Sequence, residues 1–212
     1  MTTLVATIGF DEKFAVRAIV RHLANIERFV AITSIPIDSR TSKAIGLVKQ
    51  FISTYLENTD KKLEVHTVEV DVRYPYDAIS TLRREVFEKF VGPYVLNLSG
   101  GMRALVILTL AGFVLSGAHG VIEIELENLL DVVQVDPRVF ILGKLSESKT
   151  SIIREIAKRG KATYKEISRE LGIPRATFFR ELKLLKTLGL IGVERDGKNS
   201  FYYLTELGKA YQ

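Results

Sequence analysis

The 212-residue chain contains no cysteine, which excludes disulfide bonds, thiolate metal sites and a cysteine nucleophile. It has no uninterrupted apolar run of about 18 residues, so no membrane-spanning helix is expected. Its amino-terminal sequence lacks the basic region and the cleavage site of a signal peptide. Together these absences favour an intracellular, cytoplasmic protein.

Standard nucleotide motifs and a recognisable catalytic set are also missing. The turn Ile8–Lys13 lacks the G-x-G-x-x-G pattern, and no G-x-x-x-x-G-K-[ST] loop occurs. The second predicted strand ends in Thr33-Ser34, not in an acidic residue that holds a ribose hydroxyl. The three histidines lack metal-ligand spacing, His22 is expected on a helix surface, and no G-x-S-x-G elbow surrounds Ser99. The sequence therefore indicates no metal site, no resident cofactor and no enzyme of a standard nucleotide-binding class.

What the first part of the chain does contain is a regular alternation of strands and helices. Such alternation predicts an α/β fold with a Rossmann-like, mostly parallel six-stranded sheet and helices on both faces. The strand order is not specified by the sequence. Strands are predicted at Thr3–Ile8, Phe29–Thr33, Glu64–Val70, Tyr94–Leu98, Val121–Glu127 and Asp131–Val135, and helices at Lys13–Asn25, Thr41–Leu56, Pro75–Phe90 and Met102–Ser116.

A glycine turn joins the fourth predicted strand to its helix. Ser99, Gly100 and Gly101 separate the apolar run Tyr94–Leu98 from the helix that follows. In open parallel sheets ligands bind beyond the carboxyl ends of the strands, and the N–H groups that open a helix favour anions. Arg103, in the first helical turn, can add a bidentate phosphate contact. The alternative is that the glycines serve the geometry of the turn alone.

Charge is distributed unevenly along the chain. Residues 1–143 carry 15 Lys and Arg against 17 Asp and Glu, a net charge of −2. Residues 144–212 carry 15 against 8, a net charge of +7. A basic part joined to a near-neutral body suggests that the small part meets a polyanion. A solvated basic surface without a partner is the alternative.

The basic part has the pattern of a winged helix-turn-helix. A capping box at Thr163–Glu166 starts one helix, Gly172 ends it, and Pro174 opens the next, which runs to about Leu188. Two helices joined by a short turn form a helix-turn-helix, whose second helix is the recognition helix. Two strand-like segments joined by Asp196-Gly197 then predict a hairpin, the wing. The predicted domains are residues 1–135, a linker at 136–146, and a DNA-binding domain at 147–212.

The positions of side chains along the predicted recognition helix and wing suggest which of them contact DNA. Winged helices also serve as protein–protein modules, but the basic balance favours duplex DNA. Residues near the start of the recognition helix read bases, whereas basic residues farther along it and on the wing contact phosphates. The predicted base-reading residues are Arg175, Thr177 and Phe179, and the predicted phosphate contacts are Arg180, Lys183, Arg195 and Lys198.

Taken together, the chain resembles the archaeal CRISPR-associated transcription regulators, which join a CARF (CRISPR-associated Rossmann fold) domain to a winged helix. The resemblance covers the whole chain. It rests on Thr7–Phe14 after the first strand, on the loop Ser34–Arg40, on Leu98–Arg103 and on the attached winged helix. The third of these motifs is the most specific, because winged helices are common.

The resemblance implies a homodimer built through the CARF sheets, with a ligand pocket across the two-fold axis. The implied effector is a cyclic oligoadenylate, cyclic tetraadenylate above all, and the implied partner of the winged helices is promoter DNA. Two alternatives remain: a ring nuclease that cleaves the cyclic oligoadenylate, and a DNA-binding regulator that responds to another nucleotide. The implied ligand-binding residues are Gly9, Phe10, Asp11, Ser34, Ile35, Pro36, Ser99, Gly100, Gly101, Met102 and Arg103.

Overall fold

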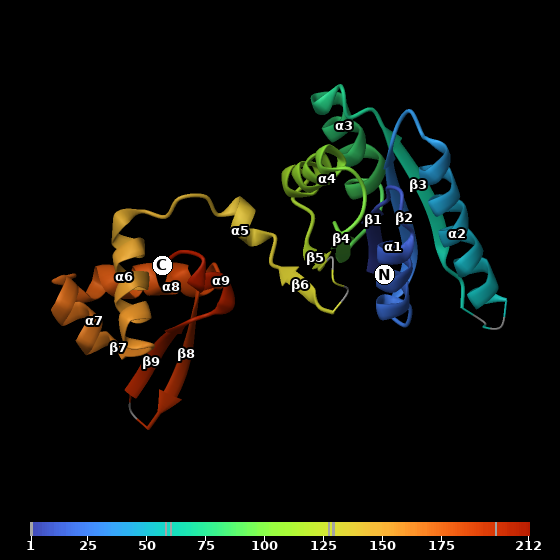
Figure 1. The fold of residues 1–212 in the computed structure, drawn as a ribbon. Coiled ribbons are helices and arrows are strands. Elements are labelled where there is room, and N and C mark those ends of the chain that lie inside the picture. Colours follow the sequence, from blue (N-terminus) through green and yellow to red (C-terminus); the bar gives the residue numbers. More distant parts are fainter. Residues whose placement is uncertain (1, 58, 60, 127, 129, 198) are drawn as a thin grey trace. The chain divides into compact units, whose positions relative to one another are not determined.

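The computed structural model describes residues 2–57, 59, 61–126, 128, 130–197 and 199–212. The chain divides into two compact units, Met1–Pro137 and Arg138–Gln212. Buried apolar residues of the first unit form two clusters and those of the second unit form a third (Figure 1). No helix within the described ranges combines the length and apolar character that a bilayer crossing requires.

The first unit is built on one six-stranded sheet in the order β3-β2-β1-β4-β5-β6. Neighbouring strands from β3 to β5 pair in parallel, and β6 pairs antiparallel with β5. The prediction of a mostly parallel, six-stranded, Rossmann-like sheet is confirmed. The chain direction across the sheet reverses between β1 and β4, which is the topological switch point where such folds bind ligands. The strands are β1 (Thr2–Thr7), β2 (Ile26–Ser34), β3 (Glu64–Val70), β4 (Tyr94–Asn97), β5 (Gly120–Glu125) and β6 (Val132–Val135).

Helices cover both faces of this sheet and give the unit two cores. Leu4 and Ala6 of β1 pack with α1 and α2, whereas Val5 packs with α3 and α4 on the opposite face. The central strand is therefore buried on both sides, as right-handed crossovers in a parallel sheet require. The helices are α1 (Lys13–His22), α2 (Ser39–Leu56), α3 (Pro75–Leu82), its π-helical continuation η1 (Arg83–Phe87), and α4 (Arg103–Leu115).

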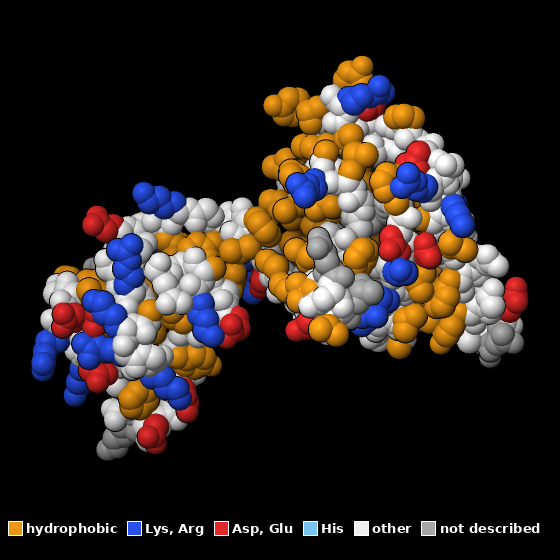
Figure 2. Space-filling view, viewed as in Figure 1, with side chains coloured by type: hydrophobic (Ala, Val, Ile, Leu, Met, Phe, Trp, Pro, Cys, Tyr) orange, Lys and Arg blue, Asp and Glu red, His pale blue; other side chains and the backbone are white. Residues whose placement is uncertain are grey.

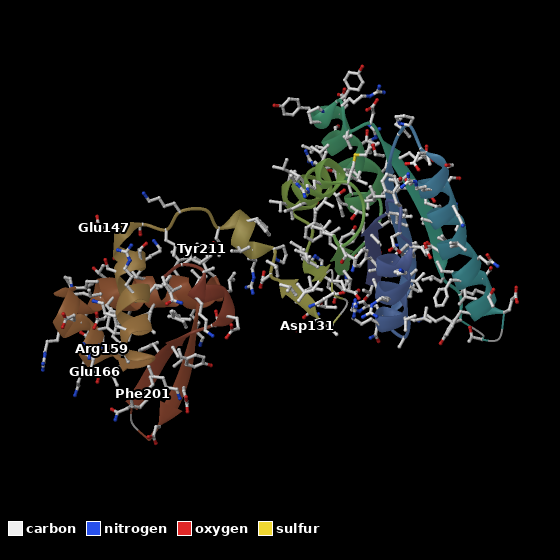
Figure 3. The ribbon with its side chains drawn as sticks, viewed as in Figure 1. Asp131, Glu147, Arg159, Glu166, Phe201 and Tyr211 are labelled. Atoms are coloured by element: carbon white, nitrogen blue, oxygen red, sulfur yellow. The ribbon has the colours of Figure 1, made fainter. Side chains whose placement is uncertain are left out.

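The second unit is a small helical domain with a three-stranded antiparallel sheet in the order β7-β9-β8. The predicted capping box is confirmed: Thr163 accepts from the Glu166 N–H, and the Glu166 carboxylate accepts from the Thr163 N–H at 2.7 Å. Figure 3 labels Glu166 in the first turn of α7 and Phe201 on β9. The elements are α5 (Arg138–Ile141), α6 (Glu147–Arg159), β7 (Lys161–Thr163), α7 (Tyr164–Leu171), α8 (Arg175–Thr187), β8 (Ile191–Asp196), β9 (Asn199–Leu204) and α9 (Glu206–Lys209).

This domain has the helix-turn-helix and hairpin that the sequence predicts. Gly172 adopts φ +61° and ends α7. The apolar side of α8 packs into the core through Phe178, Leu182 and Leu185. Strand β7 is an addition to the predicted elements, since three residues are too few to show an alternating pattern. The one-turn helix α5 lies inside the segment predicted as a linker.

Candidate functional site

A cavity of about 250 Å³ opens at the switch point of the sheet, where the chain leaves β1, β2 and β4. Nine of the eleven ligand-binding residues implied by the sequence line it: Gly9, Phe10, Asp11, Ser34, Pro36, Ser99, Gly100, Gly101 and Met102. Ile35 and Arg103 are outside its lining. The structure thus brings three loops, separate in the sequence, around one hollow.

The glycines of this site allow two loops to touch each other. A Cβ on Gly9 would lie 2.9 Å from the Gly101 Cα, and a Cβ on Gly100 would lie 2.7 Å from the Thr7 carbonyl oxygen. Gly101 has φ +85°, a conformation that side chains disfavour. The Thr7 hydroxyl donates to the Gly100 carbonyl at 2.6 Å. The glycines therefore have a geometric role in closing the two loops, whatever they also offer a ligand.

Thr33, at the end of β2, supplies the cavity with a polar group that the sequence did not single out. It is fully buried and lines the cavity. Its hydroxyl oxygen has no hydrogen-bond partner among the residues that the structure describes. Because an unsatisfied buried hydroxyl costs free energy, a cavity partner would gain a hydrogen bond here if the lining shifted to expose this oxygen.

The loop after β2 is held by Asp38, which also lines the cavity. Its carboxylate caps α2 by accepting the backbone N–H groups of Arg40 at 2.8 Å and Thr41 at 3.0 Å. The Thr41 N–H bond is the largest of the contacts that hold the pKa of Asp38 below its ordinary value. The Asp38 carboxylate is thus already engaged by the start of α2. Its position before a predicted helix is the signal by which the sequence could have identified it as an N-cap.

Phe10 and Met102 leave apolar surface at the rim. Both are exposed although they line the cavity. The Arg40 guanidinium lies 5.3 Å from the centre of the Phe10 ring, which places a cation beside the same loop. Asp11, in turn, accepts the Lys13 N–H at 2.9 Å, so its carboxylate lies at the start of α1, where the helix dipole favours a negative charge.

Helix α4 begins at the cavity with an open amino terminus. Met102 is its N-cap residue and makes no side-chain cap hydrogen bond. Arg103 follows, exposed on the first turn. Ser99 is already engaged, because its hydroxyl oxygen accepts the Glu125 N–H at 2.8 Å. The arrangement offers free helical N–H groups next to a hollow, which is the requirement for an anion site.

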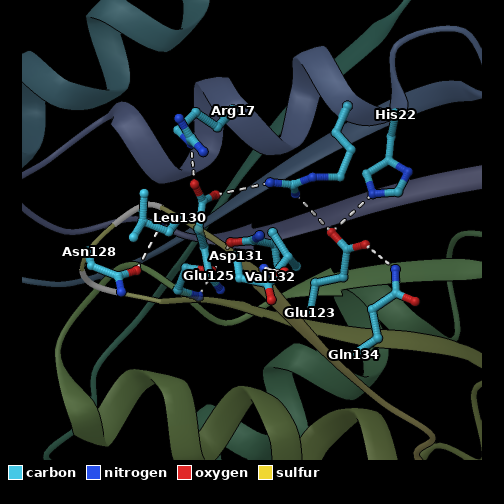
Figure 4. A network of polar contacts seen from close by, with 12 residues as sticks. Arg17, His22, Glu123, Glu125, Asn128, Leu130, Asp131, Val132 and Gln134 are labelled. Atoms are coloured by element: carbon cyan, nitrogen blue, oxygen red, sulfur yellow. Dashed lines mark hydrogen bonds and ion pairs between the residues drawn. The ribbon is translucent and has the colours of Figure 1, made fainter.

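A charge network around two buried glutamates of β5 ties this strand to α1 (Figure 4). Glu123 accepts from Arg21 at 3.1 Å, approaches His22 Nε2 at 3.0 Å, and accepts from Gln134 at 2.9 Å. Glu125 is bound by Arg17 and by Arg21. The interpretation of His22 as a helix-surface residue was therefore wrong: it is mostly buried and faces a carboxylate. No local pattern predicts this contact, since 101 positions separate its two residues.

The predicted DNA-contacting residues lie on α8 and the wing. Arg175, Phe179, Arg180, Lys183 and Arg195 are exposed, and Thr177 is half-buried. Lys198 lies outside the described residues. Figure 2 shows basic side chains spread over this unit.

Residues 2–136 match the model of the Csa3 CRISPR-associated Rossmann-like domain. The match spans well over half of the chain. The chain belongs to this CRISPR-associated Rossmann-like family. No curated protein matches it.

Two solved structures are similar to parts or all of this Csa3-family chain. One concerns the regulation of DNA binding of Bordetella bronchiseptica BpsR by 6-hydroxynicotinic acid; it is 20% identical over 35% of this chain and 63% of that one, with a TM-score of 0.31. The other is protein VC1899 from Vibrio cholerae, 12% identical over 99% of this chain and 63% of that one, with a TM-score of 0.44. The chain therefore spans less than two thirds of the length of either structure.

The Csa3-family domain also carries an apolar surface that begins at the cavity. Helix α4 has apolar residues on every side, a pattern typical of a fully buried helix. Yet Ile107 is 63% exposed and Leu115 is 61% exposed. Ile124 of β5 and Val133 of β6 are exposed as well. Figure 2 shows hydrophobic side chains gathered over the region of α4. We call these four residues the α4 face.

Proposed function

We propose that this chain is a ligand-responsive transcription regulator of CRISPR–Cas genes. Its CARF domain binds a cyclic oligoadenylate, cyclic tetraadenylate above all, between two copies of the chain, and its winged helices bind promoter DNA. The observation that carries the proposal is the cavity at the switch point of a Csa3-family domain, next to the uncapped start of α4. Family membership supplies the chemical class of ligand; the geometry supplies a place for its phosphates.

The size of the cavity supports a shared ligand site. About 250 Å³ is below the range of roughly 300–1,000 Å³ that small-molecule sites occupy. One such cavity takes a single phosphate or base with its sugar, not a ring of four nucleotides. A two-fold axis brings two identical cavities together, and a ring with four phosphates has the near-symmetry to fill both.

The α4 face supports the same dimer. Contiguous exposed apolar surface is unusual on a monomer and marks an interaction site. Met102, the exposed N-cap residue of α4, lines the cavity, and Ile107 of the α4 face lies farther along the same helix. A second copy that covers it also brings its own cavity to the axis. The occupant we assign to the α4 face is therefore an identical chain, in an isologous contact.

The winged-helix unit supports duplex DNA as the second partner. Its net charge of +7 and the exposed basic residues of α8 and the wing suit a polyanion. In this geometry Arg180, Lys183 and Arg195 contact phosphates, while Arg175, Thr177 and Phe179 face bases. The ligand regulates DNA binding if it binds the DNA-competent and DNA-incompetent states with different affinities.

The test is a calorimetric titration with cyclic tetraadenylate, followed by promoter binding with and without it. We expect one ring per two chains and a shift in promoter affinity. A panel of other nucleotides in a thermal-shift assay identifies a different effector, since a ligand at about 100 times its Kd adds about 2.7 kcal/mol of stability. Linear fragments after incubation with labelled ring would instead reveal a ring nuclease. Binding of neither ring nor DNA contradicts the proposal.

A further inference from the structure

A guanidinium and two aromatic rings meet where α8 begins. The ring of Tyr164, the first residue of α7, stacks on that of Phe179 with centroids 5.0 Å apart and planes inclined by 26°. The guanidinium carbon of Arg175 lies 5.8 Å from the Tyr164 ring centre and 5.7 Å from that of Phe179. Arg175 and Phe179 are one helical turn apart, so they share a face of α8.

The core of the domain fixes the position of these rings. Tyr164 also contacts Phe178, which is fully buried, at a centroid distance of 5.1 Å. Phe178 packs in turn against Tyr202 of β9. The capping box at Thr163 sets where α7 begins, and with it the place of Tyr164. The surface on which Arg175 rests is therefore an outward continuation of the core and not a mobile loop.

Arg175 differs from its neighbour Arg180 in what it contacts. Arg180 lies 3.7 Å from the Glu181 carboxylate. Within the described part of the chain, no carboxylate is within ion-pair distance of Arg175. The two rings lie beside its guanidinium at cation–π distance, which leaves its N–H groups available to a partner. Holding a long side chain in advance removes part of the entropy cost that binding otherwise carries.

Phe179 exposes a large apolar ring to solvent, which is unfavourable unless the ring has a partner. It is 39% exposed on the helix face that carries the basic side chains. A large apolar ring on a solvent-facing helix is explained if it supports the arginine and is itself covered when the helix is bound. The first turn of a recognition helix is the part that reaches base edges. A guanidinium placed there beside the rings presents its N–H groups as a planar fork.

We propose that Arg175 reads a guanine in the major groove, and that Tyr164 and Phe179 are positioning residues for it. A planar fork of two N–H donors matches the O6 and N7 acceptors that only guanine displays side by side in that groove. A phosphate contact would use the same charge but would convey no sequence preference. The inference rests on the proposed DNA binding and adds the base that is read and the side chains that orient its reader.

The experiment selects bound duplexes from a pool of randomised DNA with the full-length protein, and measures affinities for the selected site and its single-base variants. For the wild type we expect one G·C pair whose replacement weakens binding about tenfold or more. Arg175→Lys keeps the charge but loses the planar fork of N–H donors, so this preference should disappear. Arg154→Lys is the matched control, because Arg154 is an exposed arginine of α6 outside the predicted DNA contacts, and it should leave the preference unchanged.

Two further variants test the positioning. Tyr164→Phe keeps the ring and should retain wild-type preference, whereas Tyr164→Leu should reduce the preference at the same base pair about two- to fivefold. Phe179→Leu should also reduce the preference at that base pair. Thermal unfolding of each variant identifies loss of folding, and Phe179→Leu, at a surface position, remains informative if Tyr164→Leu does not fold.

The possible results separate the inference from the function on which it rests. If the wild-type protein binds no duplex from the pool, the proposed DNA binding is wrong and the inference is wrong as well. If the wild type selects a site but Arg175→Lys selects the same site with the same preference, DNA binding stands and the guanine reader is wrong. If Tyr164→Leu and Phe179→Leu weaken binding to all DNA sequences equally, the rings stabilise the fold and do not position the arginine.

Discussion

The Ser99 hydroxyl oxygen accepts the backbone N–H of Glu125 at 2.8 Å, so the glycine turn of the cavity is fastened to the neighbouring strand β5. The Glu125 carboxylate is bound in turn by Arg17 and Arg21 of α1, the helix that follows the first cavity loop. The glycine turn and helix α1 are therefore both held by Glu125. Strand β5 pairs with β6, which ends at Val135, shortly before the second unit begins at Arg138.

Ser99→Ala tests whether this hydroxyl serves the fold. Its removal leaves the Glu125 N–H without its acceptor, so we expect the free energy of unfolding to fall by about 1–3 kcal/mol in chemical denaturation. Ser99→Thr, which keeps the hydroxyl, is the control. An unchanged stability together with lost cyclic tetraadenylate binding would show that the oxygen contacts ligand instead.

The charge network predicts a loss of stability in acid. Burial raises the pKa of the Glu123 carboxyl, but hydrogen bonds from His22 and Gln134 and the charge of Arg21 outweigh it and hold the pKa below its ordinary value of 4.5. A carboxyl with a lowered folded-state pKa adds stability above pH 4.5, and that stability is lost as the pH falls through the folded value. We expect the free energy of unfolding to decrease in that window.

Glu123→Gln removes this titration. At neutral pH the variant should be less stable by roughly 1–3 kcal/mol, because Arg21 loses a buried anionic partner. Its stability should also change less than that of the wild type between pH 7 and pH 3. Parallel pH curves for the two proteins would mean that other carboxyls cause the acid loss.

The α4 face predicts a monomeric variant. Ile107→Glu places a charge in the surface that we assign to the second copy, so sedimentation should show a dimer for the wild type and a monomer for the variant. The affinity for cyclic tetraadenylate should also decrease when the dimer is lost, because one cavity is too small for the ring. Tyr55→Glu, at a 46% exposed site on α2, should change neither. A dimeric Ile107→Glu protein would place the interface elsewhere.

The fold was predictable where caps and periodicity are strong. Helix α7 begins and ends where the sequence indicates, since a capping box at Thr163 starts it and Gly172 ends it. The π-helical turn after Leu82 was not predicted, because the helical pattern continues through Arg83–Phe87 without a break. The strand order also emerged only in the structure, since pairing between β1 and β4 joins residues far apart in the chain.

The candidate site was predictable in its loops and not in its interior. Loops that follow parallel strands share one edge of the sheet, so the segments at Gly9, Ser34 and Gly100 could be grouped in advance. Thr33 belongs to a strand, and its contribution depends on how β2 faces the cavity. The pair His22 and Glu123 is a tertiary contact that no local spacing encodes.

The phosphate contacts predict a change in salt dependence. Arg180→Ala combined with Lys183→Ala should weaken binding to all DNA sequences alike and reduce the slope of log K against log salt by about 2, since each neutralised phosphate contributes about 0.9. Lys158→Ala combined with Lys209→Ala removes the same charge from α6 and α9, where both lysines pair with glutamates. If both double variants flatten the slope equally, net charge and not α8 contacts accounts for the effect.

Thr33 offers the most direct test of the cavity. Thr33→Val keeps the branched shape and removes a buried hydroxyl that has no hydrogen-bond partner among the described residues. The free energy of unfolding without ligand should therefore stay the same or rise by about 1 kcal/mol. If the ligand uses this hydroxyl, the Kd for cyclic tetraadenylate should rise about three- to tenfold in a calorimetric titration.

Thr109 provides the matched control, because its hydroxyl is also buried and without a described partner but does not line the cavity. Thr109→Val should have the same small effect on stability and none on ligand affinity. The two valine variants thus separate relief of an unsatisfied buried group, which both share, from loss of a ligand contact, which only Thr33 provides. Equal ring affinity in both variants would show that the ligand does not reach the end of β2.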